Sequence, residues 1–174
     1  TLIRTSGVGV SRARNLGLAK AKYELIAYLD SDNKWVSNFL EFMMASLMLF
    51  DADMVYSAIH AYVDKDNSFY RGREFDYKRL LKGNYIDLNS FVHKTSLYKQ
   101  FGGFDETLPR MVDWELLLRY CKDVPAHYVP VIGVEYDASP RADRITRREA
   151  EHYKYTILNN YLIDWDQLWR TRHT

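Results

Sequence analysis

The chain has 174 residues, of which 47% are apolar, and carries 24 Lys and Arg against 23 Asp and Glu. This length and composition predict one domain around a single core. The near-zero net charge excludes a protein whose overall field attracts nucleic acid or an anionic membrane. No apolar run approaches the roughly 20 residues that span a bilayer. One cysteine, Cys121, excludes an internal disulfide, so we expect a soluble protein with Cys121 buried as a small apolar residue.

The first third of the chain predicts a helix, a buried strand, an acidic loop and a second helix. Ser11 is a candidate N-cap for a helix that runs to about Lys22. The apolar run 25–29 predicts a central strand covered on both faces, as in the parallel sheets of α/β proteins. Asp30 and Asp32 follow this run directly. Apolar residues then recur at helical spacing, at Phe39, Leu40, Met43, Met44 and Leu47.

The rest of the chain predicts further short elements of both kinds. Strands are expected at 54–57, 59–63, 69–70, 90–93 and 127–134, and helices at 75–81, 95–101 and 111–122. A polar stretch at 137–148 precedes a C-terminal helix through Tyr155 and Tyr161. The fold class that follows is a mixed α/β domain.

Asp30 and Asp32 are the first candidates for chemistry. Ligands of open α/β sheets bind outside the carboxyl ends of the strands, where these two side chains are expected. Two carboxylates suit Mg²⁺ or Mn²⁺ and leave positions open for phosphate oxygens. The alternative is that both residues only shape the turn and the next helix. A calcium EF-hand is disfavoured, because Lys34 and Trp35 stand where it needs an oxygen ligand and a glycine.

Asp113 lies near the start of the predicted helix 111–122, where a carboxylate interacts favourably with the helix dipole. By itself this position favours a helix cap or first-turn acid. Glu115 and Arg119 stand four residues apart on the same helix and predict an exposed ion pair.

Four ordered segments resemble the family 2 glycosyltransferases, which have the GT-A fold. Residues 9–19 are similar to the family's Ala-Arg-Asn-x-Gly helix, 28–35 to its Leu-Asp-x-Asp-Asp-x-Trp loop, 102–106 to its Gly-Gly-Phe-Asp-Glu segment, and 113–119 to its Glu-Asp-Trp-x-x-x-x-Arg segment. Asn33 and Val112 stand where the family more often has acids. The resemblance extends over roughly residues 5 to 140, well beyond one short motif.

The resemblance implies an enzyme of polysaccharide biosynthesis that moves a sugar from a nucleotide-sugar donor to a hydroxyl group, with inversion. The acceptor would be a carbohydrate or a lipid-linked molecule. Asp30 and Asp32 would bind the donor and a divalent metal, Mn or Mg, with Asp32 in direct contact. Asp113 would be the general base.

Three arginines are implied in donor binding. Arg14 would lie near the donor, and an ion pair with the acidic loop is the equal alternative. Arg141 and Arg144 belong to the loop after Tyr136, which often closes over the donor in this family, so they would contact the diphosphate. For these two residues a solvated loop is the alternative.

The family's first βα units, which hold most contacts to the nucleotide base, are expected before Thr1, so we expect residues 1–174 alone to bind the donor weakly and to show little or no transfer. The chain is therefore interpreted as one N-terminally truncated catalytic domain, 1–174, with 145–174 as a C-terminal helical extension. Loss of a packed neighbour would expose apolar surface, so we expect self-association of the fragment. The expected location is cytoplasmic, with peripheral association at the inner face of the membrane left open.

Two other functions compete with transfer. A catalytically silent domain that binds carbohydrate or a partner agrees with the expected loss of the base-binding units and with the departures at Asn33 and Val112. Nucleic-acid binding would use the basic residues of the first helix, which are Arg12, Arg14, Lys20 and Lys22. We do not expect a nucleic-acid partner, because the acidic loop follows them at once and the net charge is small.

Overall fold

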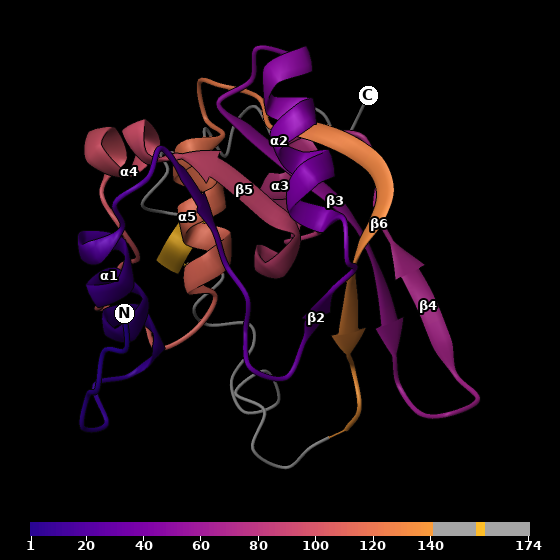
Figure 1. Cartoon of the computed structure of the whole chain (residues 1–174). Helices are drawn as coiled ribbons and strands as arrows, with labels where there is room; N and C mark the ends of the chain where they lie inside the picture. The colour runs from indigo at the N-terminus through magenta and orange to yellow at the C-terminus, as the bar shows by residue number, and fades with distance from the viewer. Residues whose placement is uncertain (141–155, 159–174) are drawn as a thin grey trace, which may run out of the picture.

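The structure is a computed structural model that describes residues 1–140 and 156–158. The strands are β1 (Leu25–Ala27), β2 (Lys34–Trp35), β3 (Met54–Tyr62), β4 (Ser68–Arg71), β5 (Phe91–Lys94) and β6 (His127–Asp137). The helices are α1 (Val10–Lys20), α2 (Phe39–Leu49), α3 (Tyr77–Lys82), α4 (Thr95–Phe101) and α5 (Val112–Tyr120), with a 3₁₀ turn η1 at Leu88–Ser90. The predicted mixed α/β architecture is confirmed (Figure 1).

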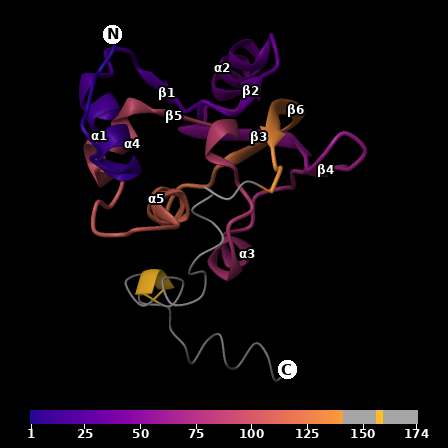
Figure 2. The same cartoon turned by 90° about the horizontal axis from the view of Figure 1, so that it is seen from below.

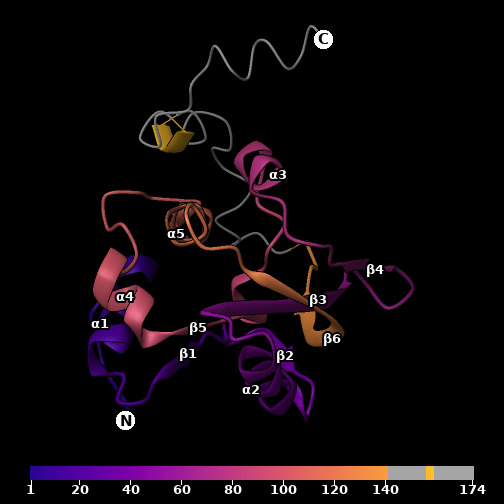
Figure 3. The ribbon, with the colours of Figure 1, turned by 90° about the horizontal axis from the view of Figure 1, so that it is seen from above.

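The six strands form one sheet in the order β1-β5-β3-β6-β2, and β4 pairs with β3 beside this path. Strands β3 and β6 run parallel, and the other described pairs are antiparallel. Helix α2 lies on one side of the sheet and α3 and α5 lie on the other, while α1 and α4 lie together near β1 and β5 (Figures 2 and 3). The parallel pair lies at the heart of the sheet, with neighbours on both sides.

Strand β3 supplies both apolar cores because its side chains alternate between the two faces of the sheet. Met54 and Tyr56 face the larger core, which includes most of the apolar side chains of α5. Val55 and Ile59 face the smaller core beneath α2. The sequence predicted two strands here, but β3 is continuous. Its irregularity at Ser57 to Ile59 is a shift of register against β6 and does not end the strand.

Strand β1 lies at one end of the strand order, so its predicted central place in the sheet is wrong. Among the described strands it pairs with β5, antiparallel, with Ile26 opposite His93. The strand ends at Ala27, and Leu29 is 47% exposed. A run of apolar residues reports burial of a strand's two faces. Such a run does not indicate which strands pair with it on either side, so the place of β1 at the end of the strand order could not be predicted from residues 25–29.

Two local predictions also differ from the structure. Helix α1 begins at Val10 after Gly9, whose positive φ of 82° suits glycine, and Ser11 lies buried inside the first turn without capping the helix. The Glu115–Arg119 pair forms at 2.7 Å, but it is largely buried. The Arg119 guanidinium also donates to the carbonyl oxygens of Phe101 and Gly103, because the Gly102 turn packs against α5.

The predicted C-terminal extension, 145–174, lies outside the described residues except at 156–158. Those three residues are helical, and Ile157 and Leu158 are buried in the larger core. Cys121 is buried as predicted, and burial raises the pKa of its thiol to about 12. No helix in the described ranges is long and apolar enough to cross a membrane.

Candidate active site

The acidic turn, residues 30–33, joins β1 to β2 and is fixed at both ends. The backbone N–H of Asn33 donates to the carbonyl oxygen of Asp30 at 3.2 Å. The Asn33 side chain is buried, and its Oδ1 accepts a hydrogen bond from the backbone N–H of Asp137 at 3.0 Å. Asn33 therefore ties the turn to the end of β6. A neutral amide performs this buried contact without the cost of burying a charge.

Asp30 is held on both sides. Arg14 of α1 donates to its Oδ1 at 2.7 Å, and the Arg14 guanidinium also lies over the ring of Phe104 at 5.3 Å. The backbone N–H of Asp30 donates to Oδ1 of Asn89 at 2.6 Å. The ion pair that the sequence left as an alternative for Arg14 is therefore present.

Asp32 differs from Asp30 in its exposure and its contacts. Its side chain is exposed, and it makes no hydrogen bond or ion pair with the residues that the structure describes. Its carboxylate oxygens are available for a ligand from the cleft.

Asp113 lies in the first turn of α5, after Met111 in a left-handed conformation with a φ of 56°. Its Oδ2 accepts a hydrogen bond from Nδ2 of Asn84 at 2.9 Å. Burial raises the pKa of Asp113, and the Asp87 carboxylate adds to this shift. The backbone N–H of Trp114 and the Arg14 guanidinium oppose it. Desolvation is the largest of these effects.

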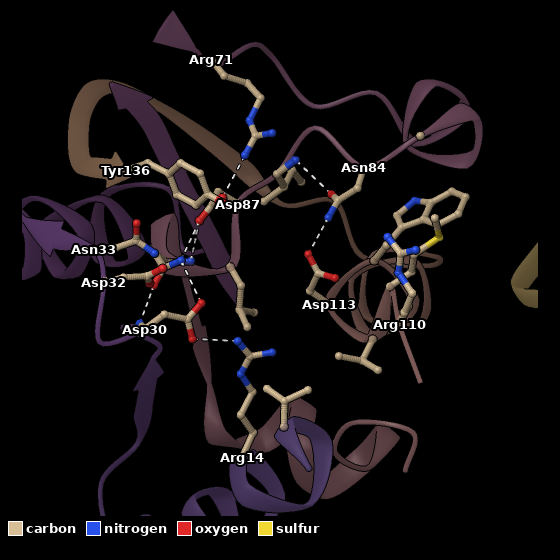
Figure 4. A pocket seen from close by; sticks show the side chains of 18 of the residues that line it. Arg14, Asp30, Asp32, Asn33, Arg71, Asn84, Asp87, Arg110, Asp113 and Tyr136 are labelled. Atoms are coloured by element: carbon tan, nitrogen blue, oxygen red, sulfur yellow. Dashed lines mark hydrogen bonds and ion pairs between the residues drawn. The ribbon is translucent and has the colours of Figure 1, made fainter. Parts of the chain in front are cut away.

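One cleft of about 630 Å³ brings these segments together. Asp30, Asp32, Asp113 and Arg14 all line it, although they come from three separate parts of the chain (Figure 4). In that view Asp113 faces the space across from the acidic turn, with Arg14 between them. The cleft therefore joins the carboxylates that the sequence singled out.

The residues present fit a divalent cation of the expected kind. The described residues contain no group of three metal-ligating side chains. Mg²⁺ is commonly bound by one or two carboxylates, with substrate phosphates and water as the other ligands. Asp32 has both oxygens available, and Asp30 has Oδ2 at the longer distance of 3.4 Å from Asn89. The two carboxylates can supply the protein's share of such a site.

The sequence did not single out the polar residues on the far wall of the cleft. Asp87 is 9% exposed and accepts hydrogen bonds from Nη2 of Arg71 at 2.8 Å and from Nδ2 of Asn89 at 2.9 Å. Asn84 and Asn89 contact the predicted carboxylates themselves. Three polar residues within the six positions 84–89, before a short predicted strand, were the available signal. Arg141 and Arg144 lie outside the described residues.

A family model for Glycosyl transferase family 2 matches residues 1–104 of this chain. The chain belongs to this family. The match includes the acidic turn and Arg14, and it ends before Asp113. The chain is 32% identical over 75 residues to the glycosyltransferase GlyG of Streptococcus pneumoniae serotype 4. The matched region covers 41% of this chain and 25% of GlyG.

The fold is shared with S. aureus TarS. The structure of TarS residues 1–349 has a TM-score of 0.63 and 15% identity, and the likeness covers 92% of this chain and 52% of that one. TarS has also been solved in complex with UDP and with UDP-GlcNAc. The chain thus spans about half the length of this TarS structure. The likeness shows that the mixed sheet with its flanking helices is the GT-A fold.

Proposed function

We propose that this protein transfers a sugar from a nucleotide-sugar donor to a hydroxyl group of a carbohydrate or lipid-linked acceptor, with a divalent metal and with inversion. The observation that carries the proposal is the single cleft shared by the acidic turn and Asp113. The UDP and UDP-GlcNAc complexes of TarS support a nucleotide sugar as the donor class. The proposed place of action is the cytoplasmic side of the membrane, free or peripheral.

Asp32 is proposed as the direct metal ligand and Asp30 as the second carboxylate. When bound, Mn²⁺ or Mg²⁺ would neutralise charge on the departing diphosphate. Arg14 holds Asp30 through an ion pair of 2.7 Å and so orients the turn that carries Asp32. In this arrangement Arg14 serves the donor site through Asp30. Arg141 and Arg144 remain proposed contacts of the diphosphate.

Asp113 is proposed as the general base. It would take the proton of the acceptor hydroxyl while that oxygen bonds to the anomeric carbon and the bond from this carbon to the diphosphate oxygen breaks. A base works best when its pKa lies near the working pH. Burial moves the pKa of Asp113 in that direction. The half-buried position therefore suits proton abstraction better than an exposed carboxylate would.

The second candidate is a silent domain that binds carbohydrate or a partner, as the substitutions at Asn33 and Val112 suggested. Both residues line the cleft but are buried, at 8% and 4% exposure: Asn33 binds the backbone of Asp137, and Val112 packs in the larger core. The acids that the family more often has there are thus replaced at buried positions, while the three aspartates assigned to the metal and the base, Asp30, Asp32 and Asp113, remain in the cleft. This favours the catalytic proposal over the silent one.

The test is turnover of UDP-GlcNAc with and without Mn²⁺, followed as release of UDP, in a protein that also carries the family's first βα units. We expect metal-dependent release that Asp113→Asn lowers through kcat and Asp32→Ala lowers through donor and Mn²⁺ binding, with folding checked by circular dichroism. Binding of the donor without any metal-dependent turnover, across a panel of nucleotide sugars, would favour the silent domain.

A further inference from the structure

The orientation of the Asn84 amide is fixed by a neighbour that can only donate. Oδ1 of Asn84 accepts a hydrogen bond from the backbone N–H of Ile86 at 3.1 Å. Nδ2 must then be the atom that faces Oδ2 of Asp113, at 2.9 Å. Since a backbone N–H cannot accept, the usual ambiguity between the two ends of an amide is absent here. Asn84 therefore donates to the Asp113 carboxylate.

Asn89 has the same arrangement toward the acidic turn. Its Oδ1 accepts the backbone N–H of Asp30 at 2.6 Å, so its Nδ2 faces the carboxylates. Nδ2 donates to Oδ1 of Asp87 at 2.9 Å and lies 3.4 Å from Oδ2 of Asp30. Asn89 is only 3% exposed. It therefore acts on Asp30 from inside the protein, while the cleft remains open on the other side.

The segment that carries both asparagines, residues 84–89, is firmly anchored. The Tyr85 hydroxyl accepts from the backbone N–H of Asp76 at 2.8 Å, and the Ser90 hydroxyl donates to the carbonyl oxygen of Asp87 at 2.8 Å. Tyr85 and Ile86 are buried in the larger core. A segment fixed in this way holds its polar side chains in one geometry, which is the condition for preorganising a site.

We propose that segment 84–89 is the positioning element of this active site, in which Asn84 orients the base Asp113 and Asn89 orients Asp30. The proposal rests on the role of Asp113 proposed above. Neither asparagine needs to touch the reacting atoms. Each holds one carboxylate, and because only five positions separate them, one rigid segment sets both sides of the cleft (Figure 4).

The chemical consequence concerns one oxygen of Asp113. The hydrogen bond from Asn84 occupies Oδ2 and so fixes how the carboxylate is turned toward the cleft. A donor to a carboxylate also favours its ionised form. Besides Asp113, the charged groups that line the same cleft are Arg14, Asp30, Asp32, Arg71, Asp87 and Arg110, and of these Asp87 and Arg14 act on the pKa of Asp113. Asn84 is a neutral group among them, so its removal changes a hydrogen bond and leaves the net charge of the cleft unchanged.

The first test is the titration of Asp113 followed by carbon NMR of its carboxyl group in the wild type and in Asn84→Ala. We expect the midpoint of Asp113 to rise by about one pH unit, a tenfold gain in proton affinity, since a hydrogen bond to a charged group is lost. Asn67→Ala is the matched control, because Asn67 donates to the Asp64 carboxylate on the exposed turn after β3, and this bond lowers the pKa of Asp64. That variant should raise the midpoint of Asp64 and leave Asp113 unchanged.

The second test is kinetic. Asn84→Ala should lower kcat by about tenfold or more with an unchanged KM for the donor, while Asn89→Ser should mainly weaken donor and Mn²⁺ binding. Thermal unfolding checks that both variants are folded. An Asp113 midpoint that does not move in folded Asn84→Ala would overturn this inference alone. Full turnover by Asp113→Asn would instead overturn the proposed function, whatever the titration shows.

Discussion

The acidic turn and the first turn of α5 bring aspartates to the same cleft but place them in opposite surroundings. Asp32 is exposed and without a described partner, whereas Asp113 is half-buried, accepts a hydrogen bond from Asn84 and has a raised pKa. Environment alone can thus give one residue type two kinds of chemistry. An exposed carboxylate suits a cation, and a desolvated one suits a proton.

The largest effect is expected from a substitution at Asp113. Asp113→Asn keeps the shape of the side chain and removes the base, so we expect kcat to fall by about 10²- to 10⁴-fold with the donor KM nearly unchanged. Steady-state kinetics of UDP release would measure both. A loss confined to KM would mean that Asp113 binds substrate and does not take a proton.

Acid should destabilise the fold through His93, a buried residue close to the acidic turn. His93 belongs to β5 and stands opposite Ile26 of β1, and its Nε2 contacts the hydroxyl of Tyr28, two residues before Asp30, at 2.9 Å. Burial lowers the pKa of His93 to about 4, against 6.5 in the unfolded chain. The unfolded state therefore binds more protons between these values, and stability is complete above pH 6.5 and lost as the pH falls toward 4. The loss should reach about 3 kcal/mol.

Urea unfolding at pH 7 and at pH 4.5 measures this loss. A His93→Gln variant should show a much smaller difference between the two pH values. An equal pH dependence in the wild type and the variant would assign the loss to other groups, the carboxylates first among them.

At Asp32 the expected effect is on binding. Asp32→Ala should weaken Mn²⁺-dependent donor binding by about tenfold or more, roughly 1.4 kcal/mol, because a direct oxygen ligand is removed. Calorimetric titration with UDP-GlcNAc and Mn²⁺ would measure it. Asp66→Ala, on the exposed turn between β3 and β4, is the control with the same side-chain change. Equal donor affinity in the wild type and Asp32→Ala would argue against Asp32 as a ligand.

The smallest effects are those of the two aspartates on stability. The pKa of Asp113 in the folded protein lies above its usual 3.8, so between these two values the native state binds more protons than the unfolded state. Stability therefore falls as the pH rises from about 3.8 through the folded pKa of Asp113. Asp113→Asn should therefore stabilise the protein at pH 7. Asp32→Asn should change the free energy of unfolding by no more than about 0.5 kcal/mol. Thermal unfolding of both variants would show whether only the buried aspartate carries this cost.

The sequence predicted different parts of this site with different success. Asp30 and Asp32 followed from their place after an apolar run, and Asp113 followed only from the family resemblance, since its position alone indicated a helix cap. Their common cleft depends on tertiary packing that no local pattern contains. Asn84 and Asn89 were missed because a single asparagine forms no periodic pattern. Their amides are oriented by the backbone N–H groups of Ile86 and Asp30, and the folded chain brings these donors into place.

The sequence likewise predicted some features of the fold and not others. The mixed α/β class followed from the alternation of strand and helix patterns, and most of the elements were found near their predicted positions. The edge position of β1 and the burial of Glu115 with Arg119 were not predicted. Both depend on neighbours distant in sequence, which hydrophobic patterns along a single segment cannot report.

The place of β6 in the sheet has a practical consequence for protein engineering. Residue 104, where the family model ends, is no point at which to divide the molecule. Strand β6 comes later in the chain, yet it lies between β3 and β2, so a chain cut at 104 would leave β2 without its described partner and open one long side of β3. Such a shortened chain should yield insoluble protein. Any truncation made for crystallisation or display has to retain the sequence through Asp137, the last residue of β6.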